Sequence, residues 1–130
     1  MNMAQTSSRY LLGIIFTVFG LNGFFHFIPQ PPPATQLGMQ YMTALATSNY
    51  FVVVFALQLI AGLLLLANRY VALALTLLAP ILVNILLYHA LIEPGSIAPG
   101  LVASVLWFIL YTRERAAFAG LFQASTPATL

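Results

Sequence analysis

The sequence contains no cysteine and no lysine, and only 5% of its 130 residues are charged. Without cysteine the chain cannot form disulfides, thiolate metal sites or the ligand set of an iron–sulfur cluster. Its four basic residues are all arginines, too few for the dense basic surface that binding to nucleic acid requires. Soluble domains carry about 25% charged residues, so this composition excludes an ordinary water-soluble domain.

Hydrophobic residues, in contrast, make up 62% of the sequence. A transmembrane helix needs about 20 mostly apolar residues. Four segments meet or approach this length, at residues 10–28, 50–67, 71–92 and 97–115. The first segment is too long for a signal peptide and has no small-residue cleavage site. The sequence therefore predicts one all-α domain, residues 1–130, that is an integral membrane four-helix bundle.

Residues 29–49 form the one long loop between the predicted helices. Its prolines, Pro29 and residues 31–33, end the first helix and hold the following backbone extended. Residues 34–47 then place apolar side chains at helical spacing, so we expect a short amphipathic helix on the outer membrane surface. At the other end of the chain we expect residues 123–130 to be a disordered tail.

Short turns at residues 68–70 and 93–96 predict antiparallel neighbours and an up-down-up-down topology. With four spans, the N-terminus, the Arg69 turn and the C-terminus share one side, and that side carries all the arginines. The positive-inside rule makes this side cytoplasmic.

Polar side chains inside a membrane are costly, so their positions are informative. Three amides lie at a depth of ~9–12 Å below the outer ends of three different helices, at a rise of about 1.5 Å per residue. Two histidines and a glutamate lie nearer the outer surface, and each histidine is four residues from a polar neighbour on the same predicted helix face. The candidate ligand-binding residues are Asn22, His26, Gln58, Asn84, His89 and Glu93.

Two interpretations of these residues remain open. The amides can bridge helices by hydrogen bonds while the histidines serve as interfacial residues, or the six residues can line a pocket. Such a pocket could transfer protons or bind a carbonyl or hydroxyl group, and a quinone headgroup has these requirements together with an apolar slot for its tail. Aromatic residues that could line the slot, or anchor the chain at the interface, are Phe24, Phe25, Phe27, Tyr88 and Trp107.

Other ligands fit the sequence less well. His26 and His89 could hold a haem, but nothing else indicates a macrocycle pocket. With Glu93 they could supply three zinc ligands, but no H-x-x-x-H spacing supports this, and no metal site is predicted. A transporter would need a larger pathway than four short spans provide, and no intramembrane charge marks the midplane.

Small residues indicate how the helices approach one another. Gly13 and Gly20 lie seven residues apart on one stripe of the first helix and allow close helix packing. Pro80 interrupts the hydrogen-bond ladder of the third span before Asn84, and a kink there would open space beside the amides or simply improve packing.

Two stretches resemble the DoxX-like family of small four-helix bacterial membrane proteins. They are RYLLGIIFTVFGLNGFFHFIPQPPP at residues 9–33 and LQLIAGLLLLANRYVALALTLLAPILVNILLYH at residues 57–89. The order and spacing of the four spans extend the resemblance to most of residues 9–118. Relatives often carry an ionisable residue where this chain has Gln58.

The resemblance implies a bacterial inner-membrane protein linked to membrane oxidoreductases, since founding members belong to a thiosulfate:quinone oxidoreductase. We therefore expect a quinone-linked accessory subunit with a redox protein complex as its partner, no intrinsic cofactor, and quinone as ligand. Glu93 would exchange protons with the outer side. The alternative is a non-enzymatic membrane scaffold or lipid-like small-molecule binding protein, forming a homo-oligomer through Gly13 and Gly20.

Overall fold

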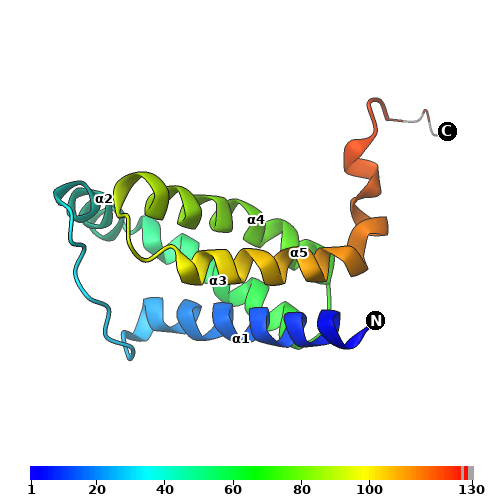
Figure 1. Ribbon diagram of the computed structural model, residues 1–130, viewed down its shortest axis with the longest axis horizontal. Coiled ribbons are helices and arrows are strands. Elements are labelled where there is room, and N and C mark those ends of the chain that lie inside the picture. The colour runs from blue at the N-terminus through cyan, green and yellow to red at the C-terminus, as the bar shows by residue number, and fades with distance from the viewer. Residues whose placement is uncertain (127, 129–130) are drawn as a thin grey trace.

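The computed structural model describes residues 1–126 and 128, and every regular element in this part of the chain is a helix (Figure 1). In chain order these are α1 (Met3–Phe25), α2 (Gln36–Thr47), α3 (Tyr50–Leu66), α4 (Val71–Leu87), the π-helix η1 (Tyr88–Ile92), α5 (Ala98–Phe118) and the 3-10 helix η2 (Ala119–Phe122). The predicted all-α class is confirmed. Residues 127, 129 and 130 of the predicted tail lie outside the described residues.

The first helix is displaced toward the N-terminus relative to the predicted segment. It begins at Met3 rather than near residue 10, because Asn2 and Gln5 form a capping box. The Gln5 N–H donates to Asn2 Oδ1 at 2.8 Å and the Asn2 N–H donates to Gln5 Oε1 at 3.2 Å. The helix ends at Phe25 rather than residue 28, because His26 adopts the left-handed conformation with φ 53°.

Helices α1 and α3 pack closely through glycines. A Cβ atom on Gly20 would lie 2.9 Å from the backbone nitrogen of Leu59, and one on Gly62 would lie 2.5 Å from that of Thr17. A Cβ on Gly13 would lie 3.2 Å from the carbonyl oxygen of Gly62. The glycine stripe of α1 is therefore covered by α3 of the same chain. It does not offer the homo-oligomer interface that the sequence led us to consider.

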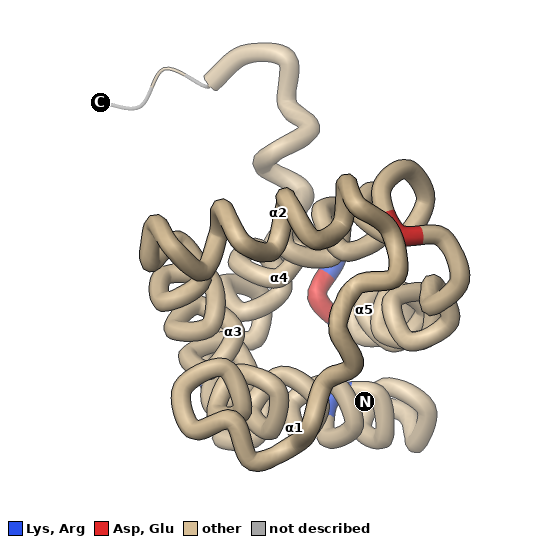
Figure 2. Tube along the Cα trace, turned by 90° about the vertical axis from the view of Figure 1, so that its left-hand side faces the viewer, with Lys and Arg blue, Asp and Glu red and all other residues tan. Residues whose placement is uncertain are grey.

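The four long helices form a ring in which α1 and α4 each pack against both α3 and α5 (Figure 2). Trp107 on α5 donates a hydrogen bond from Nε1 to the carbonyl oxygen of Leu75 on α4, at 2.9 Å. The leucines at the centre of the ring are fully buried; they are Leu12, Leu65, Leu75, Leu78 and Leu110. Pro80 lies within α4, which runs through it as one helix.

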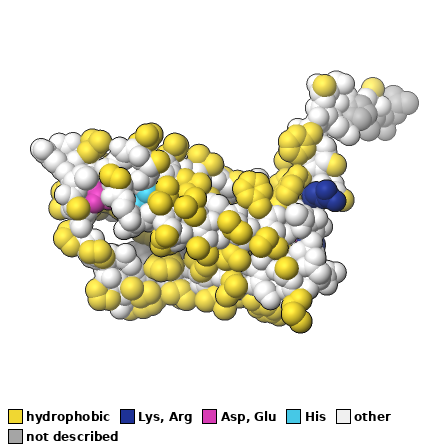
Figure 3. Space-filling model, in the orientation of Figure 1, with side chains coloured by type: hydrophobic (Ala, Val, Ile, Leu, Met, Phe, Trp, Pro, Cys, Tyr) yellow, Lys and Arg dark blue, Asp and Glu magenta, His cyan; other side chains and the backbone are white. Residues whose placement is uncertain are grey.

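Two helical segments among the described residues are long and apolar enough to cross a membrane, α1 and α4 continued by η1. The count rises to three if α2 and α3, which are bent by 83°, form one broken span. The apolar surface in Figure 3 covers much of the visible face of the helices. These features are consistent with a membrane protein.

The N-terminus, the turn after α3 and the C-terminal part of α5 lie together at one end of the molecule. Gln5 Nε2 donates to Thr112 Oγ1 at 2.9 Å, and Arg113 donates to the side-chain oxygen of Asn68 at 3.1 Å. Arg9 is only 4% exposed and donates to the last carbonyl groups of α3. A guanidinium at this position satisfies carbonyls that have no helical partner.

The opposite end is closed by α2, which packs against α3 and against η1, the continuation of α4 (Figure 2). Asn49, with φ 60°, makes the sharp turn from α2 into α3. Asparagine tolerates this left-handed conformation better than most residues. The segment 27–35 connects the end of α1 to the start of α2.

Candidate functional site: a polar cavity beneath α2

A cavity of about 840 Å³ lies between α2 and the ends of α1, α3 and α4. Its wall is largely apolar, and the surface is hollowed at this end of the molecule (Figure 3). Five of the six candidate residues line it, namely Asn22, Gln58, Asn84, His89 and Glu93. Drug-sized ligands occupy pockets of ~300–1,000 Å³, so the cavity is large enough for a substituted ring.

Gln58 is the most unusual of these side chains. It lies in the interior of α3 and is only 7% exposed, yet its amide forms no hydrogen bond with any residue in the described part of the chain. Buried polar groups in proteins are almost always paired, because an unpaired amide costs about 1–3 kcal/mol. Gln58 therefore presents an unused donor and acceptor to the cavity.

Asn84, on α4, is partly committed to its own helix. Its Nδ2 donates to the carbonyl oxygen of Pro80 at 3.1 Å. Because a carbonyl oxygen can only accept, this contact fixes the orientation of the amide. The Oδ1 atom of Asn84 and the second N–H of its Nδ2 have no protein partner among residues 1–126.

His89 lies in the π-helical turn that continues α4. Its Nδ1 lies 3.2 Å from the carbonyl oxygen of Glu93, and the backbone N–H of Glu93 donates to the carbonyl oxygen of Tyr88 at 2.8 Å. Single π-helical turns occur frequently at functional sites. The contact with an obligate acceptor makes Nδ1 the protonated nitrogen, so Nε2 is the acceptor of the neutral ring.

Asn22 and His26 differ from the expected arrangement. Asn22 lines the cavity, but its Oδ1 accepts from the N–H of Ile28 at 2.7 Å and its Nδ2 donates to the carbonyl oxygen of Ile28 at 3.3 Å. Its amide thus holds the segment after α1. His26 is exposed and does not line the cavity. The left-handed turn at His26 takes it off the helix face of Asn22, so these two residues do not share a face as predicted.

Glu93 fastens the start of α2 to the end of η1. Its Oε1 accepts from the Ala34 N–H at 2.6 Å, and its Oε2 accepts from the Thr35 N–H at 3.1 Å and the Thr35 hydroxyl at 2.6 Å. The Thr35 hydroxyl and the backbone N–H of Ala34 hold the pKa of Glu93 below its usual range. A Cβ on Gly38 would collide with the Glu93 carboxylate, so a side chain there would displace the carboxylate.

Aromatic side chains form much of the apolar wall. Tyr41 of α2 and Tyr88 of η1 have ring centroids 5.1 Å apart, and Phe51 and Phe55 of α3 stack at 5.2 Å. Of the aromatic residues suggested by the sequence, only Tyr88 lines the cavity. The other four, Phe24, Phe25, Phe27 and Trp107, lie elsewhere, and Trp107 stacks on Tyr111 with centroids 5.4 Å apart.

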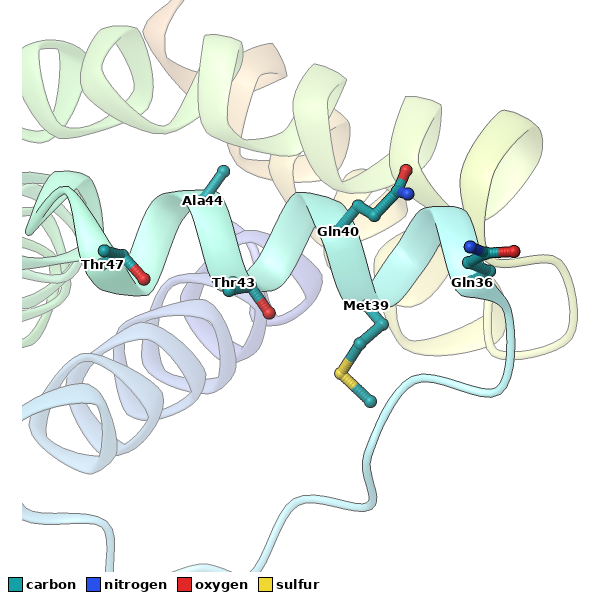
Figure 4. A pocket seen from close by; sticks show the side chains of 6 residues that line it. All are labelled: Gln36, Met39, Gln40, Thr43, Ala44 and Thr47. Carbon is teal, nitrogen blue, oxygen red and sulfur yellow. The ribbon is translucent and has the colours of Figure 1, made fainter.

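The apolar face of α2 covers this cavity. Tyr41, Met42 and Leu45 line it, whereas the opposite face of α2 is exposed and carries mainly polar side chains (Figure 4). A shallow surface depression runs along that outer face, lined by Gln36, Met39, Gln40, Thr43, Ala44 and Thr47. The amphipathic pattern of residues 34–47 thus corresponds to a helix whose inner face closes a cavity.

Among the described residues no group of three histidine, cysteine, aspartate or glutamate side chains is placed to hold a metal ion. Comparisons of the chain with protein-family models, with curated proteins and with solved structures found no match. The resemblance to the DoxX-like family stays a hypothesis from the sequence.

Proposed function

We propose that this chain is an integral membrane protein with four spans that binds a membrane quinone in the cavity beneath α2, as an accessory subunit of a quinone-linked oxidoreductase. The observation that carries the binding proposal is the Gln58 side chain, which is only 7% exposed, has no hydrogen-bond partner among the described residues and borders a largely apolar cavity. A quinone supplies a carbonyl oxygen for the amide and a flat ring for the aromatic wall.

The four-span topology is supported by helix length and by the ring packing. The 17 residues of α3 extend about 26 Å, close to the ~30 Å hydrocarbon thickness of a bilayer. Helix α5 packs beside α1 and α4 over a similar length (Figure 1). We propose that the end carrying the arginines faces the cytoplasm of a bacterial inner membrane, which places the cavity near the outer surface.

The link to an oxidoreductase rests on the resemblance to the DoxX-like family. A redox protein would supply the electrons, because this chain has no cysteine with which to relay them. Proton exchange through Glu93 is no longer part of the proposal. Its carboxylate is engaged by Ala34 and Thr35, and these donors favour the charged form.

The test is to purify the protein in nanodiscs from quinone-containing membranes and to quantify the quinone and proteins that remain bound. Wild type should retain quinone at near-stoichiometric amounts, and Gln58→Leu should retain much less. Ser104→Ala is the matched control, because Ser104 is a polar residue of α5 that does not line the cavity and bonds only to Gly100. Quinone no higher than in empty nanodiscs would contradict the proposal, and retention of phospholipid alone would favour the scaffold or lipid-binding alternative.

A further inference from the structure

The end of the chain leaves the helix ring sideways. Seen from the side and along the ring axis, the last part of α5 and η2 run away from the ring, across the direction of the long helices (Figure 1, Figure 2). Phe118 holds the start of this segment, since it is only 8% exposed and its ring centroid lies 5.3 Å from that of Tyr111. Where the long helices cross a bilayer, a segment in this direction lies parallel to the membrane surface.

Aromatic residues at this end mark the depth of the membrane boundary, because Tyr and Trp are enriched at the level of the lipid headgroups. Tyr10 and Tyr70 are 48% and 72% exposed. Trp107 and Tyr111 stack on each other with centroids 5.4 Å apart. These residues come from α1, from the turn after α3 and from α5. The sideways segment therefore begins at the level of an aromatic belt.

The sideways segment presents apolar side chains that the ring does not cover. Leu121 and Phe122, in η2, are 72% and 78% exposed. In Figure 3 hydrophobic side chains gather on the edge of this segment nearer the long helices, and the visible basic side chain lies on the edge farther from them. Burial of the apolar edge at the boundary between headgroups and acyl chains is favourable, as for other interfacial segments.

The charge at this end is strongly positive. It holds all four arginines and one acidic residue, Glu114. In the part of the chain that the structure describes, the one ion pair joins Arg113 to Glu114, at 3.1 Å. Arg69 and Arg115 are exposed and form no ion pair within residues 1–126. Two arginines beside an exposed apolar segment are complementary to a membrane surface that carries negative headgroups.

We infer that residues 115–122 are an interfacial anchor that binds anionic phospholipid at the arginine end of the molecule. Leu121 and Phe122 contact the acyl boundary, and Arg69 and Arg115 contact lipid phosphates. The inference rests on the proposed membrane topology but is independent of the quinone site. Each basic residue near an anionic surface strengthens the attraction roughly fivefold, which corresponds to ~1 kcal/mol.

The experiment measures quenching of a bimane label by lipids brominated near the top of the acyl chain, with the protein in nanodiscs. Single cysteines are introduced into this cysteine-free chain. Gly120→Cys carries the label, because a Cβ there meets nothing within 4 Å and the apolar anchor residues stay in place. Leu101→Cys, exposed on α5, is the lipid reference, and Gln40→Cys, on the outer face of α2, is the aqueous reference. The label at position 120 should be quenched nearly as strongly as that at 101 and far more than that at 40.

The choice of lipid is tested by comparing brominated phosphatidylglycerol with brominated phosphatidylcholine at the same mole fraction. The anionic lipid should associate with the region of position 120 at least roughly fivefold more tightly than the neutral lipid. Combining Arg69→Gln with Arg115→Gln should remove most of this preference. Quenching at position 101 should not depend on the two arginines.

The remaining outcomes separate the anchor from the topology. Quenching at position 101 without quenching at 120 would overturn the anchor and leave the proposed topology in place. No quenching at 101 would overturn the topology on which the anchor rests. Equal quenching at 120 by both lipids would overturn the binding of anionic phospholipid. The comparison of lipids needs no arginine variant, so it does not depend on how that variant folds.

Discussion

Replacing Gln58 by leucine should stabilise the protein without ligand and abolish its stabilisation by quinone. Leucine is one bond shorter than glutamine but branched, so it occupies most of the same space on α3 without the amide. Gln58 is 7% exposed and has no hydrogen-bond partner in the described part of the chain. Leucine thus removes a polar group that destabilises the folded protein until a ligand pairs with it.

The magnitude follows from the cost of an unpaired buried amide, about 1–3 kcal/mol. The Gln58 amide borders the cavity and is not among the fully enclosed unpaired atoms, which in the described residues are Arg9 Nε and Thr17 Oγ1. Water in the cavity would recover part of the cost, so we expect a gain near ~1 kcal/mol. Quinone at a hundred times its dissociation constant would add about 2.7 kcal/mol to wild type.

The assay is reversible unfolding in bicelles, with and without decylquinone, for wild type, Gln58→Leu and the Ser104→Ala control. The variant should be more stable than wild type without quinone and should gain nothing from it. A variant that is less stable than wild type by about 1 kcal/mol or more would refute the reasoning. A loss of stability of that size is roughly the contribution of one hydrogen bond, and it would mean that the Gln58 amide bridges helices in the wild type.

Three further predictions concern the cover, the packing and the topology. Glu93→Gln should raise the rate of hydrogen exchange over residues 34–38 at neutral pH. In wild type the protection of these amides is complete above the ordinary carboxyl pKa of about 4.5 and is lost as pH falls through the lowered pKa of Glu93. The variant should show no such loss of protection in acid. Gly62→Leu should separate α1 from α3 and cost ~1–3 kcal/mol in unfolding assays, whereas Gly120→Ala should be neutral, because a Cβ there meets nothing within 4 Å. Single cysteines at Asn68 and Gln40, introduced into this cysteine-free chain, should react with an impermeant maleimide from opposite sides of the membrane; labelling from the same side would exclude the proposed topology.

The sequence predicted the helical segments because long apolar runs are separated by prolines and short polar turns. The structure brings Gln58 and Asn84 to one cavity, as their similar calculated depths suggested. Depth can be read from sequence because a regular helix rises a fixed distance per residue. That regularity fails at helix ends, and there the sequence reasoning failed as well.

His26 shows the failure most clearly. Four-residue spacing from Asn22 predicts a shared face only while the helix continues, and the chain turns left-handed at His26 itself. Pro29 was a signal that the helix would end nearby, but it could not indicate which residue would leave the helix first. The bond between Asn22 and Ile28 depends on that same turn.

The aromatic wall and the role of Glu93 required tertiary structure. Tyr41 lies within the amphipathic helix predicted at residues 34–47, but only the fold of α2 over the cavity brings its ring to Tyr88. Glu93 binds Thr35 across 58 positions of sequence, and no local pattern specifies that partner. The glycine at position 38, close to a Thr35 helix cap, was the one local sign that something approaches α2 there.

The most direct test of quinone binding beneath α2 is photolabelling with an azido-quinone, followed by peptide mass spectrometry. The label should attach to cavity residues such as Tyr41, Phe55 and Tyr88, and excess decylquinone should suppress it. Labelling spread over outward-facing residues such as Leu101 and Phe108, undiminished by excess decylquinone, would show that the quinone only dissolves in the surrounding lipid, contrary to the proposed site.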